Sequence, residues 1–407
     1  MRVLVLGSGA REHALCVALA ADPAVGSIVC APGNAGTETI AAPRAIAIDD
    51  PAAVAALAEQ VQADLVLVGP EAPLVAGVTD VLRDRGFAVF GPSAAAARIE
   101  GSKAFAKDVM SAAGVPTADS WKVAAGDDAR LEQVLAGLPA PYVVKHDGLA
   151  GGKGVVVTDD LATAIAHGRG HDVVVETYLD GPEISLFGVV TDDGRVLPLT
   201  PAQDHKRVGD GDIGPNTGGM GAYTPLPWAP ADLVDEVTRT VLEPTIAELG
   251  RRGTPFSGLL YAGLALTSGG LRVVEFNARF GDPEVQAVLA RLRTPLTRVL
   301  SGATAPVWRD ESAVTVVLAA PGYPQAPQLG GVLRGPLDAP GVLHAGTRRQ
   351  PDGSVVASGG RVLSVTALGT SVADARGSAY DLLARIHLPG GHYRRDIGHF
   401  ALARPGR

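Results

Sequence analysis

The chain has little cysteine, no long apolar run and no excess of positive charge. Cys16 and Cys30 are its two cysteines, too few for a disulfide framework or a zinc ribbon. No apolar run approaches the roughly 20 residues of a membrane span, and the run after Met1 reaches glycine too soon for a signal peptide. The net charge of −8 over 407 residues is not that of a nucleic-acid binder. We therefore expect a globular cytoplasmic enzyme with neither a membrane nor nucleic acid as a partner.

Lysine is also scarce, with six lysines among 35 basic residues. Arginine serves almost everywhere else, so a retained lysine indicates a place where a compact ammonium cannot be exchanged for a planar guanidinium. Four of the six lie in segments that carry other signs of chemistry. The lysines are Lys103, Lys107, Lys122, Lys145, Lys153 and Lys206.

Residues 1–100 alternate continuous apolar runs with helical segments rich in alanine and leucine. This pattern is typical of a parallel, doubly wound sheet. Each predicted strand leads into a glycine or proline loop, and ligands of open α/β sheets bind at the carboxyl ends of the strands. A substrate crevice is therefore expected along this edge. The predicted strands are Arg2–Leu6, Ser27–Cys30, Ala45–Ile48, Leu65–Val68 and Ala88–Phe90, with helices near 11–20, 51–62 and 76–85.

The first loop, Gly7 to Glu12, is an incomplete dinucleotide-binding turn. Glu12 stands where the third glycine belongs and would crowd the contact between helix and strand. The second strand ends without the carboxylate that binds a ribose, so a nicotinamide or flavin cofactor is disfavoured. The backbone amides ahead of the helix could still bind a phosphate, and a simple tight turn is the alternative.

A glycine-rich loop, residues 147–154, separates the predicted strands Tyr142–Lys145 and Val155–Thr158. Its Gly-Lys pair is not followed by serine or threonine, so it is not a Walker loop. Glycines let backbone amides approach phosphate oxygens, while Lys145 and Lys153 would add positive charge. The loop is predicted to be a flap over a polyphosphate, with a surface hairpin as the alternative.

Residues 274–282 carry the clearest chemical pattern. Glu275, Asn277 and Arg279 fall on one face of a strand by its period of two. A carboxylate and an amide oxygen are hard ligands suited to Mg²⁺ that carries nucleotide phosphates, and the arginine can bind a carboxylate or phosphoryl oxygen. An edge strand with a solvated polar face is the alternative. The opposite face, expected in the core, has Val274, Phe276 and Phe280.

Two further segments could bind a nucleotide or a substrate. After the apolar run Val173–Val175, residues 176–179 could offer backbone groups to an adenine and Glu183 could bind the ribose, although a solvated turn is the commoner explanation. Residues 203–223 form a long polar, glycine-rich stretch of a kind that is usually functional or disordered. It supplies aspartate, lysine and arginine side chains together with accessible amides.

The remaining segments are mainly structural. Ser102 is a suitable N-cap for a helix through Ala113, which Gly114 would end. The last hundred residues are predicted to form short strands, such as Val314–Leu318 and Arg361–Val365, and a closing helix near 371–386. This region carries little obvious chemistry.

Together these segments resemble the glycinamide ribonucleotide synthetase family of the ATP-grasp superfamily. The matching pieces run nearly end to end and include GSGAREHAL, APGNAGT, VGPEAPLV, EGSKAF, KHDGLAGGKGV, QDHKRVGDGDIGPNTGGMGAYTP and EFNARFGDPE. The resemblance implies a multidomain α/β and α+β fold. Its parts would be an N-terminal doubly wound substrate domain (1–101), an ATP-grasp domain (102–300, with a flap subdomain at about 119–185) and a small C-terminal α+β domain (305–407).

The reaction that this resemblance implies joins glycine to 5-phosphoribosylamine, consumes ATP, and gives glycinamide ribonucleotide, ADP and phosphate. The implied cofactors are ATP and Mg²⁺ or Mn²⁺, with Glu275 and Asn277 as the metal ligands. A monomer is expected, in transient contact with the enzyme that makes phosphoribosylamine. Catalytic roles are expected for Arg279, Lys145 and Asp204. ATP contacts are expected from Lys103, Lys145, Gly151, Gly152, Lys153, Glu176, Leu179 and Glu183. Substrate contacts are expected from Gly9, Asn34, Gly36, Glu71, Lys206, Arg207, Asn216, Gly218, Arg279 and Asp282.

The chain departs from the family pattern in two places. His146 and Gly151 replace alanines of the glycine-rich loop, and the segment between that loop and Glu176 is shorter than usual. Both changes concern nucleotide affinity and flap motion. Another ATP-grasp carboxylate–amine ligase and a nucleotide-binding regulatory protein are the alternative functions.

Overall fold

The computed structural model describes residues 1–149 and 154–403. The phosphate contacts predicted for Gly151, Gly152 and Lys153 lie outside these ranges. Within them, no helix has both the length and the apolar character needed to cross a membrane.

The N-terminal sheet confirms the predicted parallel, doubly wound arrangement. Its strand order is β3-β2-β1-β4-β5, and all four pairings are parallel. The strands are β1 (Arg2–Gly7), β2 (Ser27–Pro32), β3 (Ala42–Pro43), β4 (Leu65–Val68) and β5 (Val89–Phe90). The helices are α1 (Ala10–Ala20), α2 (Pro51–Gln60), α3 (Glu71–Val75) and α4 (Val78–Asp84), with a short turn η1 (Thr37–Thr39).

The strand predicted at Ala45–Ile48 is wrong. The edge strand β3 ends at Pro43, and residues 45–48 continue without a strand partner. Ile46 and Ile48 are half-buried against the core, whereas Ala45 and Ala47 are exposed. The apolar pattern is thus satisfied by side-chain packing at the edge of the sheet, without backbone pairing.

Glu12 fits beside the sheet because two glycines leave room for it. A Cβ atom on Gly69 would lie 2.0 Å from Glu12 Oε1, and one on Gly7 would lie 2.5 Å from its carboxyl carbon. The buried carboxylate accepts hydrogen bonds from the Gly9 amide and from Arg11 Nε, both at 2.6 Å. The crowding expected at this position is therefore avoided, and Glu12 occupies the Gly9 amide that a phosphate would need.

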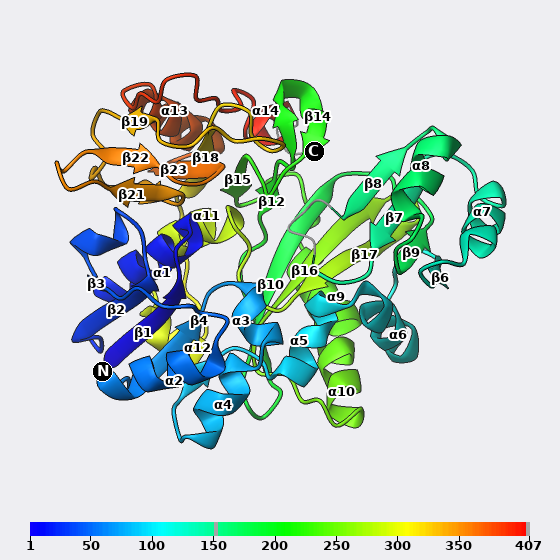
Figure 1. Cartoon of the computed structure of the whole chain (residues 1–407), viewed down its shortest axis with the longest axis horizontal. Coiled ribbons are helices and arrows are strands. Elements are labelled where there is room, and N and C mark those ends of the chain that lie inside the picture. Colours follow the sequence, from blue (N-terminus) through cyan, green and yellow to red (C-terminus); the bar gives the residue numbers. More distant parts are fainter. Residues whose placement is uncertain (150–153, 404–407) are drawn as a thin grey trace.

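The middle of the chain forms two lobes (Figure 1). The smaller lobe has the sheet β6-β9-β7-β8 covered by two helices, and the larger has the antiparallel sheet β11-β10-β16-β17. The smaller lobe contains β6 (Ser120–Val123), α7 (Asp128–Ala136), β7 (Tyr142–His146), β8 (Val155–Thr158), α8 (Leu161–Gly168) and β9 (Val173–Glu176). The larger contains β10 (Glu183–Val190), β11 (Val196–Pro198), α9 (Leu233–Val237), η3 (Thr238–Leu242), α10 (Glu243–Arg251), β16 (Gly258–Thr267) and β17 (Gly270–Asn277). The next two helices are α11 (Glu284–Arg291), which packs against α1 and the C-terminal sheet, and α12 (Leu296–Leu300), which contacts α1.

Two helices join the N-terminal sheet to these lobes, α5 (Ala94–Gly101) and α6 (Lys103–Ala113). Ser102 caps α6 by accepting a hydrogen bond from the Phe105 amide, and Gly114 ends the helix with a φ of 67°. Both features were predicted, because serine satisfies a free amide at the start of a helix and glycine adopts the left-handed conformation at its end.

A β-bulge interrupts β17 and corrects the predicted facing of one side chain. Glu275 pairs with Gly263 and Val273 pairs with Leu264, so Val274 has no partner. Val273 is fully buried in its place, whereas Val274 lines a cavity. The simple period of two fails here because the extra residue shifts the side chains that precede Glu275.

The C-terminal sheet includes two strands, β12 and β15, that begin within the polar 203–223 stretch. Its order is β12-β15-β18-β23-β20, from β12 (Gln203–Asp204), β15 (Gly221–Thr224), β18 (Ser312–Ala319), β20 (Val342–His344) and β23 (Arg361–Gly369). Between β12 and β15 lie the hairpin strands β13 (Arg207–Gly209) and β14 (Ile213–Asn216), with the turn η2 (Asp210–Asp212). The region is completed by β19 (Val332–Leu333), β21 (Thr347–Arg349), β22 (Val355–Ala357), α13 (Val372–Leu383) and α14 (His399–Ala403).

Candidate active site

A cavity of about 380 Å³ lies where the N-terminal helices, the two lobes and the C-terminal sheet meet. We call it the central cavity. It brings together side chains far apart in the sequence, from Arg11 to Arg361. The predicted site residues that line it are Glu71, Lys103, Lys145, Glu176, Asp204, Lys206, Gly218, Glu275, Asn277, Arg279 and Asp282.

Lysine side chains gather at the end of the cavity formed by α6 and β7. Lys145 Nζ lies 2.9 Å from one Glu176 oxygen, and Lys107 Nζ lies 3.3 Å from the other. Lys145 also donates to the carbonyl of the bulged residue Val274 at 3.1 Å, and Lys103 donates to the Gly148 carbonyl at 3.0 Å. One carboxylate thus faces two ammonium groups, and the excess positive charge suits phosphate oxygens.

Burial changes the pKa of two of these lysines. It lowers the pKa of Lys107 to about 8, against the opposing effect of Glu176. It also lowers the pKa of Lys103, although Glu275 favours the charged form. Lys107 was not predicted as a site residue, but two signals could have found it. Lysine is rare in this chain, and Lys107 lies four residues after Lys103, on the same face of α6.

Arg279 is held between two carboxylates that come from different helices. Its guanidinium lies 2.8 Å from Glu100 and 3.2 Å from Glu71. Burial raises the pKa of Glu100 despite the nearby arginine. Burial alone would raise the pKa of Glu71 too, but Arg279 and Arg11 bring it below its usual range. The arginine is therefore fixed in place before any ligand arrives.

Glu275 and Asn277 are the candidate metal ligands. Asn277 Oδ1 lies 3.5 Å from the Arg279 guanidinium, and Glu275 forms no ion pair with any described residue. Within residues 1–149 and 154–403, no cluster of three or more His, Cys, Asp or Glu residues could hold a metal. A metal here would have to complete its coordination with oxygens from outside the protein, which is how Mg²⁺ commonly binds with a nucleotide.

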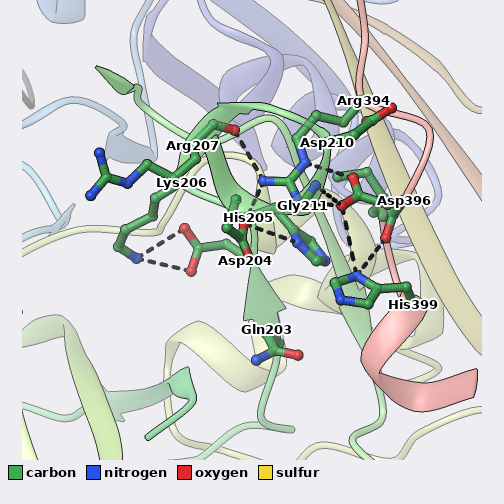
Figure 2. Close-up of polar contacts among 12 residues, drawn as sticks. Gln203, Asp204, His205, Lys206, Arg207, Asp210, Gly211, Arg394, Asp396 and His399 are labelled. Atoms are coloured by element: carbon green, nitrogen blue, oxygen red, sulfur yellow. Dashed lines mark hydrogen bonds and ion pairs between the residues drawn. The ribbon is translucent and has the colours of Figure 1, made fainter. Parts of the chain in front are cut away.

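Asp204 and Lys206 form an ion pair that faces the cavity. Lys206 Nζ lies 2.9 Å from both oxygens of Asp204 and 3.6 Å from Glu183. His205, between them, points the other way (Figure 2) and accepts a hydrogen bond from the Gly398 amide at 3.1 Å. Burial lowers the pKa of His205 to about 4, so the ring stays neutral and can accept this bond.

Residues 394–396 contact the β13–β14 hairpin next to His205 (Figure 2). Arg394 has a fully buried side chain that donates to Asp212 at 2.6 Å, to Asp396 at 2.7 Å and to the Arg207 carbonyl at 3.1 Å. Asp396 in turn accepts from the Gly211 amide at 2.8 Å. We call these contacts the C-terminal clasp. The C-terminal region, which showed little chemistry in the sequence, thus supports the loop that carries Asp204 and Lys206.

The C-terminal sheet also contributes Arg361, which was not predicted. Its guanidinium lies 3.0 Å from Asp282 and donates to the carbonyls of Asp282 and Gly218. Burial would raise the pKa of Asp282, but Arg361 brings it below its usual range. The other ionisable residues of the cavity wall that were not predicted are Arg11, Glu100, Tyr261 and Glu284.

Several residues predicted to contact the substrates or ATP do not line the central cavity. The Asn34 side chain forms all its hydrogen bonds with backbone atoms. Its Nδ2 donates to Ser8 O and His344 O at 2.8 Å, and its Oδ1 accepts from the amides of Gly36 and Thr37. It thereby holds the loops of the N-terminal sheet together. Also outside the wall are Gly9, Gly36, Leu179, Glu183, Arg207 and Asn216.

Family models of phosphoribosylglycinamide synthetase match three successive parts of the chain. The N domain matches residues 1–100, the ATP-grasp (A) domain 101–285 and the C domain 313–400. The chain belongs to the phosphoribosylglycinamide synthetase family. It is therefore an ATP-dependent ligase of the ATP-grasp type, and members of this type use ATP with a divalent metal.

Individual relatives of this synthetase family agree over the full length. The chain is 59% identical to the phosphoribosylamine–glycine ligase of Streptomyces coelicolor and 57% identical to that of Mycobacterium tuberculosis, over 98% of each chain. The crystal structure of the Thermotoga maritima phosphoribosylamine–glycine ligase has a TM-score of 0.84 at 32% identity, covering 98% of this chain and all of that one. The biotin carboxylase domain of the Hydrogenobacter thermophilus 2-oxoglutarate carboxylase has a TM-score of 0.72 at 17% identity, over 96% of this chain and 91% of that domain, and shares the fold alone.

Proposed function

We propose that this protein joins glycine to 5-phosphoribosylamine, with ATP as the energy source, and releases glycinamide ribonucleotide, ADP and phosphate. This is a step of purine biosynthesis. The observation that carries the proposal is the central cavity, where lysines, a carboxylate–amide pair and a fixed arginine converge. Relatives that carry this activity in their name match the whole chain.

The lysine end of the cavity would bind the nucleotide. Lys103 and Lys145 would contact the phosphates, together with the glycine-rich loop and its Gly151, Gly152 and Lys153. Glu176, Leu179 and Glu183 would contact the adenosine part. Because Lys145 is already paired with Glu176, an arriving phosphate would exchange one anionic partner of this lysine for another.

Glu275 and Asn277 would hold Mg²⁺ or Mn²⁺. Their carboxylate and amide oxygens are hard ligands, and Glu275 forms no ion pair with another described residue. A metal held there would supply positive charge against the transferring phosphoryl group. Arg279 and Lys145 would add positive charge at the same place.

The chemistry requires activation of a carboxylate. A carboxylate is a poor electrophile, and an amine does not displace its oxygen at useful rates near neutral pH. The glycine carboxylate would attack the γ-phosphate of ATP, which releases ADP and forms glycyl phosphate. The amine of phosphoribosylamine would then attack the acyl carbon and release phosphate. Catalytic roles fall to Arg279, Lys145 and Asp204, which stabilise charge and position the reactants.

The phosphoribosyl group would lie against the N-terminal loops. Gly9, Asn34 and Gly36 shape these loops, and Glu71 comes from the same edge of the sheet. Asp282, Gly218, Lys206, Arg207 and Asn216 would close this part of the site from the other side. We further propose domain boundaries at 1–101, 102–300 (flap at about 119–185) and 305–407, a cytoplasmic monomer, and transient contact with the enzyme that supplies the labile phosphoribosylamine.

The proposal is tested by ADP release with ATP, glycine and freshly made phosphoribosylamine, each omitted in turn. Release should require all three, and the product should be glycinamide ribonucleotide. Glycine labelled with ¹⁸O in its carboxylate should pass one label into the released phosphate. Label found wholly in the amide product and residual glycine would exclude glycyl phosphate. Comparable turnover with another amino acid or another amine would indicate a different ATP-grasp ligase.

A further inference from the structure

The carboxylates of the central cavity differ in whether a cation already faces them. Seven carboxylate side chains line it among the described residues, and five have a lysine or arginine within 4.0 Å. Glu275 and Glu284 are the two without one. Glu275 has the neighbour Asn277 and the oxygen chemistry of a metal ligand. Glu284 is therefore the remaining carboxylate without a described lysine or arginine within 4.0 Å, although Lys206 and Arg279 lie close enough to act on its charge. The five paired carboxylates are Glu71, Glu100, Glu176, Asp204 and Asp282.

Glu284 is held rigidly although it lacks a cation. It is the first residue of α11 and only 4% exposed. Its Oε1 accepts from Tyr261 Oη at 3.1 Å and from Ser185 Oγ at 3.3 Å, and these two hydroxyls lie 2.8 Å apart. Gly281 makes room for the carboxylate, because a Cβ atom there would lie 2.6 Å from Glu284 Oε2. Two hydroxyls thus fix one oxygen, and no other described residue donates a hydrogen bond to Oε2.

The surroundings of Glu284 favour the binding of a cationic group. Burial, together with the nearby Asp204 carboxylate, raises the pKa of Glu284 to about 7 against the opposing effects of Lys206 and Arg279. A buried carboxylate without a partner is costly to ionise, and a cation placed against it removes that cost. The site is also close to the candidate metal ligands, since Tyr261 on β16 is the direct partner of Asn277 on β17.

Glycine brings one positive charge into this cavity. Its carboxylate has to reach the γ-phosphate, so its ammonium, two bonds away, needs an anion beside the metal ligands. We propose that Glu284 binds the α-ammonium group of glycine, with Tyr261 and Ser185 holding the carboxylate in place. This assignment rests on the proposed function. It makes Glu284 the residue that distinguishes glycine from small carboxylates without a positive charge.

The test compares Glu284→Gln with Glu243→Gln. Glutamine keeps an oxygen that can accept from Tyr261 and Ser185 but removes the negative charge. Glu243 is also the first residue of a helix, α10, and it is exposed and does not line the cavity. We expect Glu284→Gln to raise the KM for glycine by about 10- to 100-fold, the usual effect of losing a charged hydrogen bond. The KM for ATP and for phosphoribosylamine should stay near wild type, and Glu243→Gln should change none of them.

A second readout is the preference for glycine over glycolate, which carries a hydroxyl in place of the ammonium. Wild type should strongly prefer glycine by kcat/KM, and Glu284→Gln should lose most of this preference. An unchanged preference, or an equal loss toward all three substrates, would overturn the assignment.

The wild-type enzyme provides a test that does not depend on a folded variant. The KM for glycine should rise as the pH falls through about 7, because protonated Glu284 cannot pair with an ammonium, and the KM for ATP should not follow. A glycine KM that is flat between pH 6 and pH 8 would contradict the role of Glu284. Failure of wild type to form glycinamide ribonucleotide at any pH would instead refute the proposed function.

Discussion

Arg394→Met removes the centre of the C-terminal clasp and should loosen the loop that carries Asp204 and Lys206. The buried guanidinium has two aspartate partners and one carbonyl partner. Methionine fills much of the same volume without making these bonds, so the change tests the polar contacts rather than the packing.

The expected loss of local stability depends on how exposed the two aspartate partners of Arg394 are. Breaking a fully buried ion pair costs about 3–5 kcal/mol, largely because the remaining charge stays buried. Here the Asp212 and Asp396 side chains are 45% and 20% exposed, so water can reach them once Arg394 is gone. We therefore expect a cost of about 2–3 kcal/mol, which corresponds to a local opening roughly 30- to 150-fold more frequent.

The assay is hydrogen exchange of the peptide spanning residues 203–217, with steady-state kinetics in parallel. Arg394→Met should speed exchange in this peptide and lower kcat/KM for glycine and phosphoribosylamine. The KM for ATP should change little, because the lysines proposed to contact the nucleotide lie on α6 and β7. The matched control is Arg395→Met. The Arg395 side chain is exposed, and this residue contacts the hairpin through its backbone amide, which donates to Asp210. Identical exchange and kinetics in the two variants would refute the positioning role of the clasp.

Three further outcomes are expected. Glu275→Ala should reduce turnover at least about a hundredfold without unfolding the protein, and excess Mg²⁺ should not restore wild-type activity; normal activity at limiting Mg²⁺ would exclude Glu275 as a ligand. Gly69→Ala should lower the free energy of unfolding by about 2–3 kcal/mol, because its Cβ would collide with the buried Glu12; Gly137→Ala, whose Cβ makes only an ordinary contact at 3.5 Å, is the control in urea denaturation. Burial lowers the pKa of His13 to about 3. Below about pH 6.5 the unfolded chain therefore binds a proton that the folded chain does not, and the free energy of unfolding should fall by about 1.4 kcal/mol for each pH unit. A His13→Gln variant should show a shallower pH dependence, and an equal slope would contradict this reasoning.

Local sequence signals predicted the features that depend on neighbouring residues. Ser102 and Gly114 bracket α6 because a serine cap and a left-handed glycine act within one turn of the helix. The continuous apolar runs predicted a parallel N-terminal sheet, since both faces of such a sheet are buried. The spacing of Glu275, Asn277 and Arg279 placed all three on the wall of one cavity.

The two structural predictions that were wrong have a common cause: each depended on a strand elsewhere in the chain. Residues 45–48 have the composition of a strand, but no neighbouring strand is available beyond the edge at β3. Val274 leaves the core because the pairing of β16 with β17 contains an extra residue, and the register of two strands cannot be read from one of them. The catalytic, ATP-binding and substrate-binding roles predicted for individual residues stay predictions, both for residues on the cavity wall and for those outside it, such as Gly9 and Asn34.

The sequence by itself determined the family, the parallel N-terminal sheet, the cap and stop of α6, and the cluster of glutamate, asparagine and arginine at the end of β17, because each is specified by short-range spacing. Only the tertiary structure decided which carboxylates meet a cation and which do not. Glu100 reaches Arg279, Arg361 reaches Asp282, and Arg394 reaches Asp212 across separations of 179, 79 and 182 residues. Electrostatic pairing depends on distance in space, so the position of Glu284, with no described lysine or arginine within 4.0 Å, can be read only from the folded cavity.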